Sequence, residues 1–443
     1  MRQFEFAENI NIEEFDGFAR DNSGKVKTHF LGSYEWGEVS KIRSWQPLHV
    51  GVRENGRLVA TALVLKKALV AGYTYFYIPR GFTMDWEDLE LLEYFTGAIK
   101  ALGKKHKALF FKIDPDIRLH RVDVEGNVTG DAPDGIADGA LSERNNNEDL
   151  VRFLEGLGYK RKPLNYAFEN EQPRFTFRID ITGTLEDIQA RYSKTTLHEI
   201  RKSHESHVEA YIGTADDIPE FVRLTKMTEA RQGYISHDMG FYAKFYDILH
   251  KYGMADIYLG RVDIKALTER AKADLAENEA LRTKYAEGQS KKARGMVKEI
   301  DNRLAALHKK LAELEGRPQE QVIVCAYLTV KYLDKIWTLY GANDMDYSRY
   351  YPNYAVYEKM IEDANAEGLR VFDGFGTVGR PDAAGSAIGL YEFKKKWGGE
   401  LTEFIGEFDY ILNKPVFFAY SKLIPIYHNI QNKRIMKRQQ ASE

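Results

Sequence analysis

Short apolar runs and one long amphipathic segment alternate along the first 160 residues. Strand-forming apolar residues fill 58–65, 74–78 and 108–113, which are the lengths of single strands. Between the last two runs, residues 86–106 place Leu89, Leu92, Phe95 and Ile99 on one helical face. The pattern predicts a mixed α/β domain over residues 1–160. Its loop at 125–147 is long for a compact domain, so we expect it to be mobile or functional.

A second α/β pattern begins near Phe175-Thr176-Phe177-Arg178-Ile179-Asp180. Thr184, followed by Asp187 three residues later, predicts a helix that starts with a capping box. The pattern stops after residues 257–259 and resumes at 322–324. We therefore expect a second domain made of residues 161–263 and 317–415.

Residues 264–316 interrupt that domain with a different composition. They contain no proline and are rich in Ala, Glu, Lys, Leu and Arg, as is typical of long helices and coiled coils. Apolar stripes over 267–281 and 297–314 flank a turn at 287–290, which predicts an antiparallel coiled-coil hairpin. At ~1.5 Å per residue, each arm of roughly 23 residues would extend ~35 Å.

The hairpin is also more basic than the rest of the chain. It holds 12 Lys or Arg against 9 Asp or Glu, a net of +3, whereas the whole chain carries −3. Near its turn, Lys291, Lys292 and Arg294 could contact RNA phosphates. A solvated helical surface is the alternative interpretation of each of these charges.

Composition sets the broad class of the protein. Of 443 residues, 44% are hydrophobic and 29% charged, the balance of a globular protein with a sizeable core. No run approaches the ~20 apolar residues of a membrane span, and the N-terminus lacks a signal-peptide stretch, so we expect a cytoplasmic location. The single Cys325 excludes an intrachain disulfide and a thiolate-rich zinc site, and its apolar neighbours predict inert packing. The negative net charge gives no general attraction to nucleic acid, and no DNA partner is expected.

Chemistry-bearing residues are densest between residues 339 and 399. Four segments stand out there: Tyr340-Gly341-Ala342, Tyr351-Pro352-Asn353-Tyr354, Phe372-Asp373-Gly374-Phe375-Gly376 and Gly389-Leu390-Tyr391-Glu392-Phe393-Lys394-Lys395-Lys396-Trp397-Gly398. Asn353 predicts the start of a helix and Gly368 its end.

These four segments, in this order, resemble the signature of the Fem family of tRNA-dependent aminoacyltransferases, which build the interpeptide bridges of peptidoglycan. Earlier in the chain, Tyr77-Ile78-Pro79-Arg80-Gly81 is similar to the family's Tyr-x-Pro-Arg-Gly motif. Residues 30–36 resemble its Gln-Ser-x-x-Trp segment, with Gly32 in place of the usual Gln, and residues 200–203 resemble its Ile-Arg-Lys-Ala run. The resemblance covers nearly the whole chain, including the position of the hairpin in long-armed members.

The resemblance implies an α/β (α+β) fold of two GNAT-like (N-acetyltransferase-like) domains with an inserted antiparallel coiled-coil arm. It implies transfer of an amino acid from aminoacyl-tRNA to the stem-peptide amine of a peptidoglycan precursor, either lipid II or UDP-MurNAc-pentapeptide. The aminoacyl ester is already activated, so positioning and charge stabilisation can supply much of the catalysis, and we expect no metal and no cofactor.

The resemblance also assigns candidate site residues. Lys394 matches the signature lysine and is expected to hold a diphosphate or carboxylate or to stabilise the oxyanion; an exposed charge run with Lys395 and Lys396 is the alternative. Asp373 would orient the amine or accept its proton, unless it caps the next turn. The expected substrate-binding residues are Arg231, Tyr242, Lys41, Arg80 and Tyr351, and the expected tRNA-binding residues are Lys291, Lys292 and Arg294.

Some of these assignments have competing interpretations. Arg231 offers a guanidinium fork suited to phosphate, whereas Tyr242 could equally be a core aromatic. Lys41 is one position later than the family's lysine, which Ser40 replaces.

Two other patterns are weak by comparison. Residues 374–379 match Gly-x-Gly-x-x-Gly, but a dinucleotide site also needs a helix opening at that turn, and the following residues suggest a loop. His204 and His207 lack a carboxylate partner in the pattern and are not expected to bind a metal.

The C-terminal segment 416–443 is aromatic and ends in a basic stretch. We expect it to dock on the first domain, with transient contact to the inner face of the membrane if the precursor is lipid-linked. Two other functions remain open from the sequence: an acyl-CoA-dependent N-acyltransferase of the same fold, and a non-enzymatic RNA-binding protein.

Overall fold

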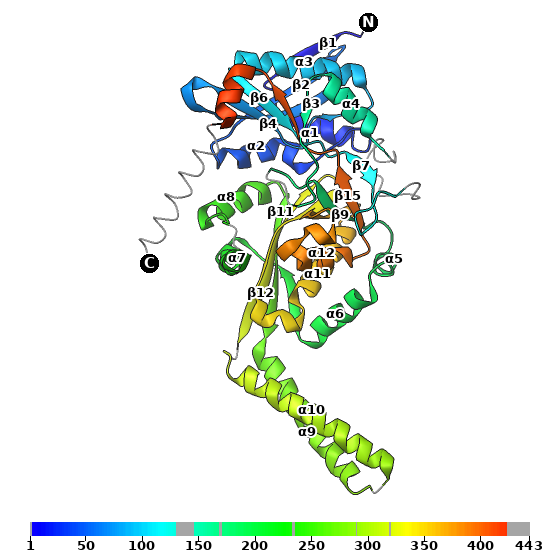
Figure 1. Cartoon of the computed structure of the whole chain (residues 1–443). Helices are drawn as coiled ribbons and strands as arrows, with labels where there is room; N and C mark the ends of the chain where they lie inside the picture. Colours follow the sequence, from blue (N-terminus) through cyan, green and yellow to red (C-terminus); the bar gives the residue numbers. More distant parts are fainter. Residues whose placement is uncertain are drawn as a thin grey trace.

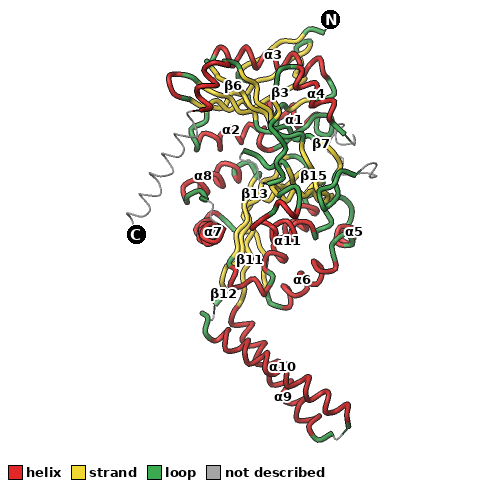
Figure 2. Tube along the Cα trace, in the orientation of Figure 1, coloured by secondary structure: helices red, strands yellow, loops and turns green. Residues whose placement is uncertain are grey.

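Two mixed β-sheets, each with helices packed on it, form the body of the molecule, and a helical hairpin projects from one end (Figure 1). The structure is a computed structural model that describes residues 2–129, 146–167, 171–232, 235–288, 290–318 and 320–422. Helices and strands alternate along both halves of the body (Figure 2), as the sequence pattern predicts for a mixed α/β protein.

The first sheet is antiparallel except where β4 and β6 run parallel. In spatial order its strands are β1 (Phe4–Glu8), β2 (Gln46–Glu54), β3 (Arg57–Ala68), β4 (Thr74–Ile78), β6 (Ala108–Ile113), β16 (Phe408–Ile411) and β8 (Lys160–Arg161), with β5 (Thr83–Met84) paired to β3. The helices of this half are α1 (Ile12–Asp21), α2 (Tyr34–Lys41), α3 (Leu89–Lys105) and α4 (Glu148–Gly156).

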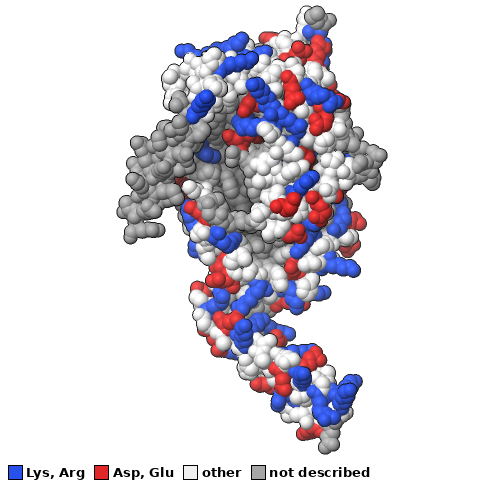
Figure 3. Space-filling model, in the orientation of Figure 1, with Lys and Arg blue, Asp and Glu red and all other residues white. Residues whose placement is uncertain are grey.

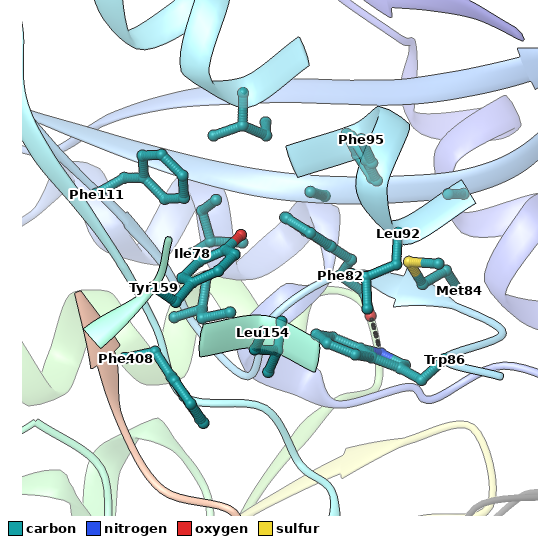
Figure 4. Close-up of a cluster of buried hydrophobic side chains, with 14 of the residues drawn as sticks. Ile78, Phe82, Met84, Trp86, Leu92, Phe95, Phe111, Leu154, Tyr159 and Phe408 are labelled. Carbon is teal, nitrogen blue, oxygen red and sulfur yellow. Dashed lines mark hydrogen bonds between the residues drawn. The ribbon is translucent and has the colours of Figure 1, made fainter. Parts of the chain in front are cut away.

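The core of this half lies between the sheet and α3, the helix predicted over residues 86–106. Helical spacing turns Leu92, Phe95 and Ile99 inward, and all are fully buried. The rings of Phe95 and Phe82 stack with their centres 4.4 Å apart, and the Trp86 indole nitrogen donates to the Phe82 carbonyl at 3.0 Å (Figure 4). This packing holds β4 in place, and the chain leaves β4 directly into the predicted Arg80 motif.

The second sheet follows the strand order β10 (Val208–Ile212), β11 (Ala255–Asp263), β12 (Gln321–Tyr332), β13 (Lys335–Asn343), β14 (Val371–Thr377), β9 (Phe175–Asp180), β15 (Glu400–Phe404) and β7 (Arg118–Arg121). Only the β13–β14 pairing is parallel among the described pairs. The helices here are α5 (Leu185–Gln189), α6 (Lys194–Glu205), α7 (Ile218–Gln232), α8 (Met239–His250), α11 (Pro352–Ala366) and α12 (Ile388–Lys395).

Local signals fix several helix ends in this half. The predicted capping box is present, with the Thr184 and Asp187 side chains bonding each other's backbone amides. Gly368, at φ +79°, follows α11 as predicted. The predicted start at Asn353 is wrong by one residue: α11 begins at Pro352, whose fixed φ suits the first helical turn, and Tyr351 is the N-cap.

The two sheets exchange strands, so the predicted boundaries at 160 and 415 do not separate them. β7 follows β6 closely in the chain yet pairs with β15 in the second sheet. β16 follows β15 yet pairs with β6 in the first sheet. The two crossing segments touch, because the amide of Ile405 donates to the carbonyl of Ile117 at 2.8 Å. Periodicity identifies each strand but not the sheet that it joins.

The insertion forms a helical hairpin of α9 (Ile264–Ala286) and α10 (Lys291–Glu315), which projects away from the body (Figure 1). Its apolar stripes face inward, with Leu267, Ala271, Ile300 and Leu311 buried. The hairpin agrees with the prediction, while its coiled-coil character stays a prediction.

The described part of the C-terminal segment is helical over residues 414–422. The rings of Phe417 and Tyr420 lie 5.1 and 6.4 Å from that of Phe110 in β6, so this part contacts the first sheet. Residues 423–443, including the predicted basic stretch, lie outside the described residues.

Candidate active site

A buried layer of charged side chains lies where the two sheets exchange strands. Its centre is Arg178 of β9, which faces Asp373 of β14 as a cross-strand neighbour. The Arg178 Nε donates to Asp373 Oδ2 at 2.8 Å, and its Nη2 donates to both oxygens of Asp116 at 2.7 and 2.9 Å. All three side chains are almost fully buried. Arg178 thus joins the second sheet to the segment that crosses from the first sheet.

More cations than carboxylates surround this centre. Burial, the largest influence, raises the pKa of Asp116, but Arg178, Lys335, Arg80 and Lys27 outweigh it and lower the pKa to about 2. These four basic side chains are themselves buried. The layer is therefore electropositive, which suits the binding of anionic groups and the stabilisation of developing negative charge.

Lys394 lies at the edge of this layer on α12. Its side chain is buried, and its Nζ donates to the carbonyls of Phe375 and Gly376 at 2.9 and 2.7 Å. Burial lowers the pKa of Lys394 to about 7, while Asp373 acts in the opposite direction. The exposed-charge-run alternative does not fit this position. Lys395, by contrast, points outward and pairs with Glu125.

A bulge in β14 presents these two carbonyls to the lysine. Pairing with β9 shifts register between Asp373 and Gly376, and Phe375 adopts a left-handed φ of +54°. Gly374 packs so closely that a Cβ there would lie 3.0 Å from the Tyr357 hydroxyl. The glycine at this position therefore permits the close approach that aims the strand end at Lys394.

Asp373 has its acceptor capacity largely occupied. Besides Arg178, it accepts from the Thr176 hydroxyl and from the amide of Phe375 at 2.8 Å. The hydrogen bond from the Phe375 amide is the turn-capping interaction that the sequence left open as an alternative. These contacts indicate that Asp373 positions the bulge and Arg178. They make a role of Asp373 as a proton acceptor less favourable.

Arg80 belongs to the same buried layer. It adopts a left-handed φ of +59°, and its amide donates to Asp114 Oδ1 at 2.6 Å. Its guanidinium lies 4.7 Å from the ring centre of Phe404, which Arg178 also approaches at 5.0 Å. Asp114 accepts from the Tyr77 hydroxyl as well, and burial raises the pKa of Asp114 to about 7. The Tyr-x-Pro-Arg-Gly segment thus anchors itself through Asp114.

The other predicted substrate-binding residues lie elsewhere. Arg231 is exposed at the end of α7, with its Nη2 3.4 Å from Asn343 Oδ1. Lys41 is exposed at the end of α2 and pairs with Glu38 at 2.6 Å. Tyr351 is partly buried, with a φ of +56° before α11. Within the described residues, no hydrogen bond, ion pair or ring contact joins any of these three side chains directly to Lys394.

The position of Tyr242 does not support its predicted substrate-binding role. Only 2% of the residue is exposed, and its ring packs edge-on against Phe221 and Tyr340 at 5.0 and 5.4 Å. The apolar face of α8 covers the second sheet here, so Tyr242 is a core aromatic, the alternative that the sequence left open.

The basic residues of the hairpin lie at its far tip. Lys291, Lys292 and Arg294 are exposed in the first turn of α10, and Figure 3 shows basic side chains gathered at this end of the arm. They have no ion-pair partner within the described part of the chain. A cluster of this kind is accessible to phosphates.

Sequence reasoning missed Arg178, Asp116, Lys335 and Lys27. Arg178 carried little local signal, because Phe175, Phe177 and Ile179 alternate with Thr176, Arg178 and Asp180, the period of a half-buried strand whose polar face is solvated. The sequence analysis did not single out Asp116, although it follows a strand closely. Their pairing depends on strands far apart in sequence, which no local pattern reveals.

The site has no feature typical of a metal or dinucleotide site. No group of three or more His, Cys, Asp or Glu side chains that could hold a metal is present among the described residues. His204 does have a carboxylate partner, since its Nε2 lies 2.7 Å from Glu358 Oε2, a contact that the sequence did not predict. After the glycine-rich run, the chain forms short 3-10 turns at Pro381–Ala383 and Gly385–Ala387 before α12, so no long helix opens at that turn.

Comparison with known proteins identifies the family of this chain. Residues 10–424 match the FemAB family. The chain belongs to the FemAB family. This confirms the family resemblance drawn from the sequence. Within the described residues, no helix combines the length and apolar character needed to span a bilayer.

Relatives of this FemAB-family chain carry consistent names. The lipid II:glycine glycyltransferase of Staphylococcus epidermidis (strain ATCC 35984) is 28% identical over 431 residues, covering 94% of this chain and 95% of the relative. The protein of the same name from Staphylococcus aureus (strain bovine RF122 / ET3-1) is 28% identical over 432 residues, with the same coverage. The crystal structure of FemX matches with a TM-score of 0.72 and 26% identity, over 94% of this chain and 99% of FemX. The prediction of an aminoacyltransferase agrees with these names.

Proposed function

We propose that this FemAB-family protein transfers glycine from glycyl-tRNA to the stem-peptide amine of lipid II, forming part of a peptidoglycan interpeptide bridge. The observation that carries the proposal is the buried Lys394, with a pKa lowered to about 7, at the edge of an electropositive layer between two sheets. The names of the relatives support glycine and lipid II as substrates. The proposal includes the prediction that each of the two halves is an N-acetyltransferase-like (GNAT-like) domain.

The proposed chemistry needs one proton acceptor and one anion-stabilising group. The stem-peptide amine attacks the ester carbonyl carbon, and the bond from that carbon to the ribose oxygen of tRNA breaks. Neutral Lys394 accepts the proton that the amine loses and returns it to the ribose oxygen. The cations of the buried layer stabilise the oxyanion or hold the precursor's diphosphate.

The hairpin of α9 and α10 offers a binding surface for the tRNA. Its exposed basic tip is held away from the body by two helices of 23 and 25 residues, which at ~1.5 Å per residue extend ~35 Å. An RNA whose acceptor end reaches the body could contact the tip with a distant part of its backbone. Lys291, Lys292 and Arg294 would then bind phosphates.

The direct test incubates the purified protein with a mixture of labelled aminoacyl-tRNAs and either lipid II or UDP-MurNAc-pentapeptide. We expect label from glycyl-tRNA to enter lipid II, and Lys394→Ala to lose most of the rate. Arg231→Ala tests whether this exposed guanidinium binds the precursor's phosphates, in which case the rate should fall at low precursor concentration. Lys395→Ala is the matched control, because this neighbouring lysine pairs with Glu125 at the surface.

Transfer from another aminoacyl-tRNA, or only to the UDP-linked acceptor, would correct the substrate while keeping the reaction class. Absence of transfer to both acceptors, with every tRNA active in a control enzyme, would overturn the proposal. Transfer from acyl-CoA would then identify the protein as an N-acyltransferase, and tRNA binding without any transfer would identify an RNA-binding protein.

A further inference from the structure

Three segments far apart in sequence meet at one end of the central strands of the first sheet, where β4 and β6 begin and β16 ends. The amide of Thr74, at the start of β4, donates to the Lys107 carbonyl at 3.1 Å. The amides of Leu412 and Asn413, just after β16, both donate to the Leu109 carbonyl. The β3–β4 loop, the end of α3 and the helix at 414–422 therefore share this edge, here called the lysine edge (residues 66–73, 104–107 and 414–422).

The lysine edge has a single sign of charge. Its segments contain seven lysines and neither Asp nor Glu, on a chain whose net charge is −3. Lys105 pairs with Glu8 from β1, and the Lys66 Nζ lies 3.4 Å from the His106 ring. Lys104, Lys107, Lys414 and Lys422 are exposed. Figure 3 shows Lys and Arg side chains on the side of the first sheet that includes this edge.

Apolar side chains project from the same edge. Val70, at the tip of the β3–β4 loop, is 75% exposed, and Phe418 is 62% exposed. Among the described large hydrophobic residues, only Val128 and Ile235 reach a similar exposure. The Lys422 ammonium lies 4.4 Å from the centre of the Phe418 ring. Apolar tips surrounded by lysines fit an interface where the hydrocarbon begins beneath anionic headgroups.

We propose that the lysine edge docks the protein on an anionic lipid bilayer, with Val70 and Phe418 inserted among the headgroups. RNA would also fit the lysines, but the exposed valine and phenylalanine have no use against a phosphate backbone and favour lipid. The inference rests on the proposed lipid-linked acceptor for its biological purpose and deepens that proposal, whereas its test requires no catalysis.

The orientation that follows is consistent with access to both substrates. β4 begins at the lysine edge and leads to Arg80; its five residues span ~17 Å at ~3.3 Å per residue. A precursor anchored in the bilayer could extend its headgroup along this distance toward the buried charged layer. The hairpin projects from the opposite end of the body, so its basic tip would face away from the lipid (Figure 1).

Co-sedimentation of the full chain with vesicles tests the proposal. We expect binding to phosphatidylcholine vesicles that contain phosphatidylglycerol, and little binding to phosphatidylcholine alone or at high salt. Because each lysine near an anionic surface strengthens binding by roughly fivefold, Lys104→Glu/Lys107→Glu/Lys422→Glu should weaken it at least tenfold. Val70→Ser/Phe418→Ser should weaken it with less dependence on salt.

Matched control variants remove the same residue types elsewhere. Lys309→Glu/Lys310→Glu on the arm and Ile212→Ser on β10 should bind vesicles as the unaltered protein does. Circular dichroism and thermal melting check that every variant folds. Equal binding by the edge variants and the controls would overturn the proposal, as would absence of binding to anionic vesicles. Loss of tRNA binding with vesicle binding intact would reassign the edge to RNA.

Transfer assays separate this inference from the proposed function. With lipid II in detergent micelles, the edge variants should keep the unaltered rate, and with lipid II in anionic vesicles they should lose it. Vesicle binding without transfer in either format would refute the proposed function and leave the docking surface standing. Equal transfer rates of edge variants and controls on vesicles would show that docking at this edge does not serve the reaction.

Discussion

Replacing Lys394 by arginine separates two roles that its position permits. Arginine keeps a positive charge at every accessible pH, so it can hold an anion but cannot accept a proton. The lysine, by contrast, loses its charge near neutrality, because burial lowers its pKa to about 7. If Lys394 accepts the proton of the attacking amine, only its neutral form supports transfer.

The structure sets the size of the effect. With a pKa of about 7, the neutral fraction of Lys394 rises from roughly 9% at pH 6 to roughly 91% at pH 8, about tenfold. The difference from the ordinary lysine pKa of 10.5 corresponds to about 5 kcal/mol against the charged form. Solvent screening reduces this little, since the residue is only 8% exposed. The two carbonyl bonds to Phe375 and Gly376 keep the nitrogen fixed in either form.

Single-turnover transfer rates measured from pH 6 to pH 8 provide the assay. The acceptor amine also titrates, so the informative quantity is the ratio of the unaltered rate to the Lys394→Arg rate at each pH. Proton acceptance predicts that this ratio rises about tenfold across the range and that Lys394→Arg is slower throughout. Lys395→Arg is the control and should give a ratio that does not change with pH.

The opposite outcome would refute the proton-acceptor role. If the lysine acts through its charge, the ratio should fall as pH rises, and Lys394→Arg should retain most of the rate. A flat ratio with both enzymes equally active would remove Lys394 from the chemistry. Nitrogen NMR of the labelled lysine side chains, in the unaltered protein and in Lys394→Arg, would check independently that one lysine titrates near pH 7.

Four further predictions address the buried layer, the arm and the thiol. Arg178→Met should lower the free energy of unfolding by about 3–5 kcal/mol in a denaturant titration, because it leaves two buried carboxylates without their partner. Asp116→Asn should make acid unfolding less steep. The pKa of Asp116 is lowered from 3.8 to about 2, so the charged form contributes about 2 kcal/mol above pH 4 that is lost as pH falls through about 2. Lys291→Glu/Lys292→Glu should weaken tRNA binding and reduce the slope of log affinity against log salt by about 2, with unchanged melting, and Lys309→Glu/Lys310→Glu is the control. Cys325, fully buried and with its pKa raised by burial, should react with a thiol reagent only on unfolding.

The elements that the sequence predicted well are those with a local apolar period. The helix containing Leu92 and Phe95, the strand at 74–78 and the hairpin between 264 and 316 each show their burial in the spacing of their own residues. Capping chemistry was equally local, as at Thr184 and Gly368. Proline at the first helical position overrode the capping preference of Asn353 by a single residue.

The site was predictable only in its signature residue. Lys394 and Asp373 belong to recognisable segments, but Arg178 and Asp116 are 62 residues apart in sequence and meet through strand exchange. Tyr242 shows the converse error, because a tyrosine on a helix gives no local sign of whether it faces a core or a cleft. Arg178 lies on the polar side of an alternating pattern, so no local pattern showed that both faces of its strand are buried.

The exchange of β7 and β16 between the two sheets gives a physical reason for the position of the buried charged layer. Asp114 and Asp116 lie in the segment that leaves the first sheet for the second, and Phe404 lies where the chain is about to return. Arg178 binds the first crossing and, with Arg80, packs on the second, so the ion pairs hold the two sheets at one relative position. Desolvating these charges costs free energy that an apolar junction would avoid. Asp373, which Arg178 binds, also acts electrostatically on Lys394. The position of these charges is therefore explained if the layer's field acts on a substrate beside Lys394, and the pH dependence of the Lys394→Arg ratio measures one part of that field.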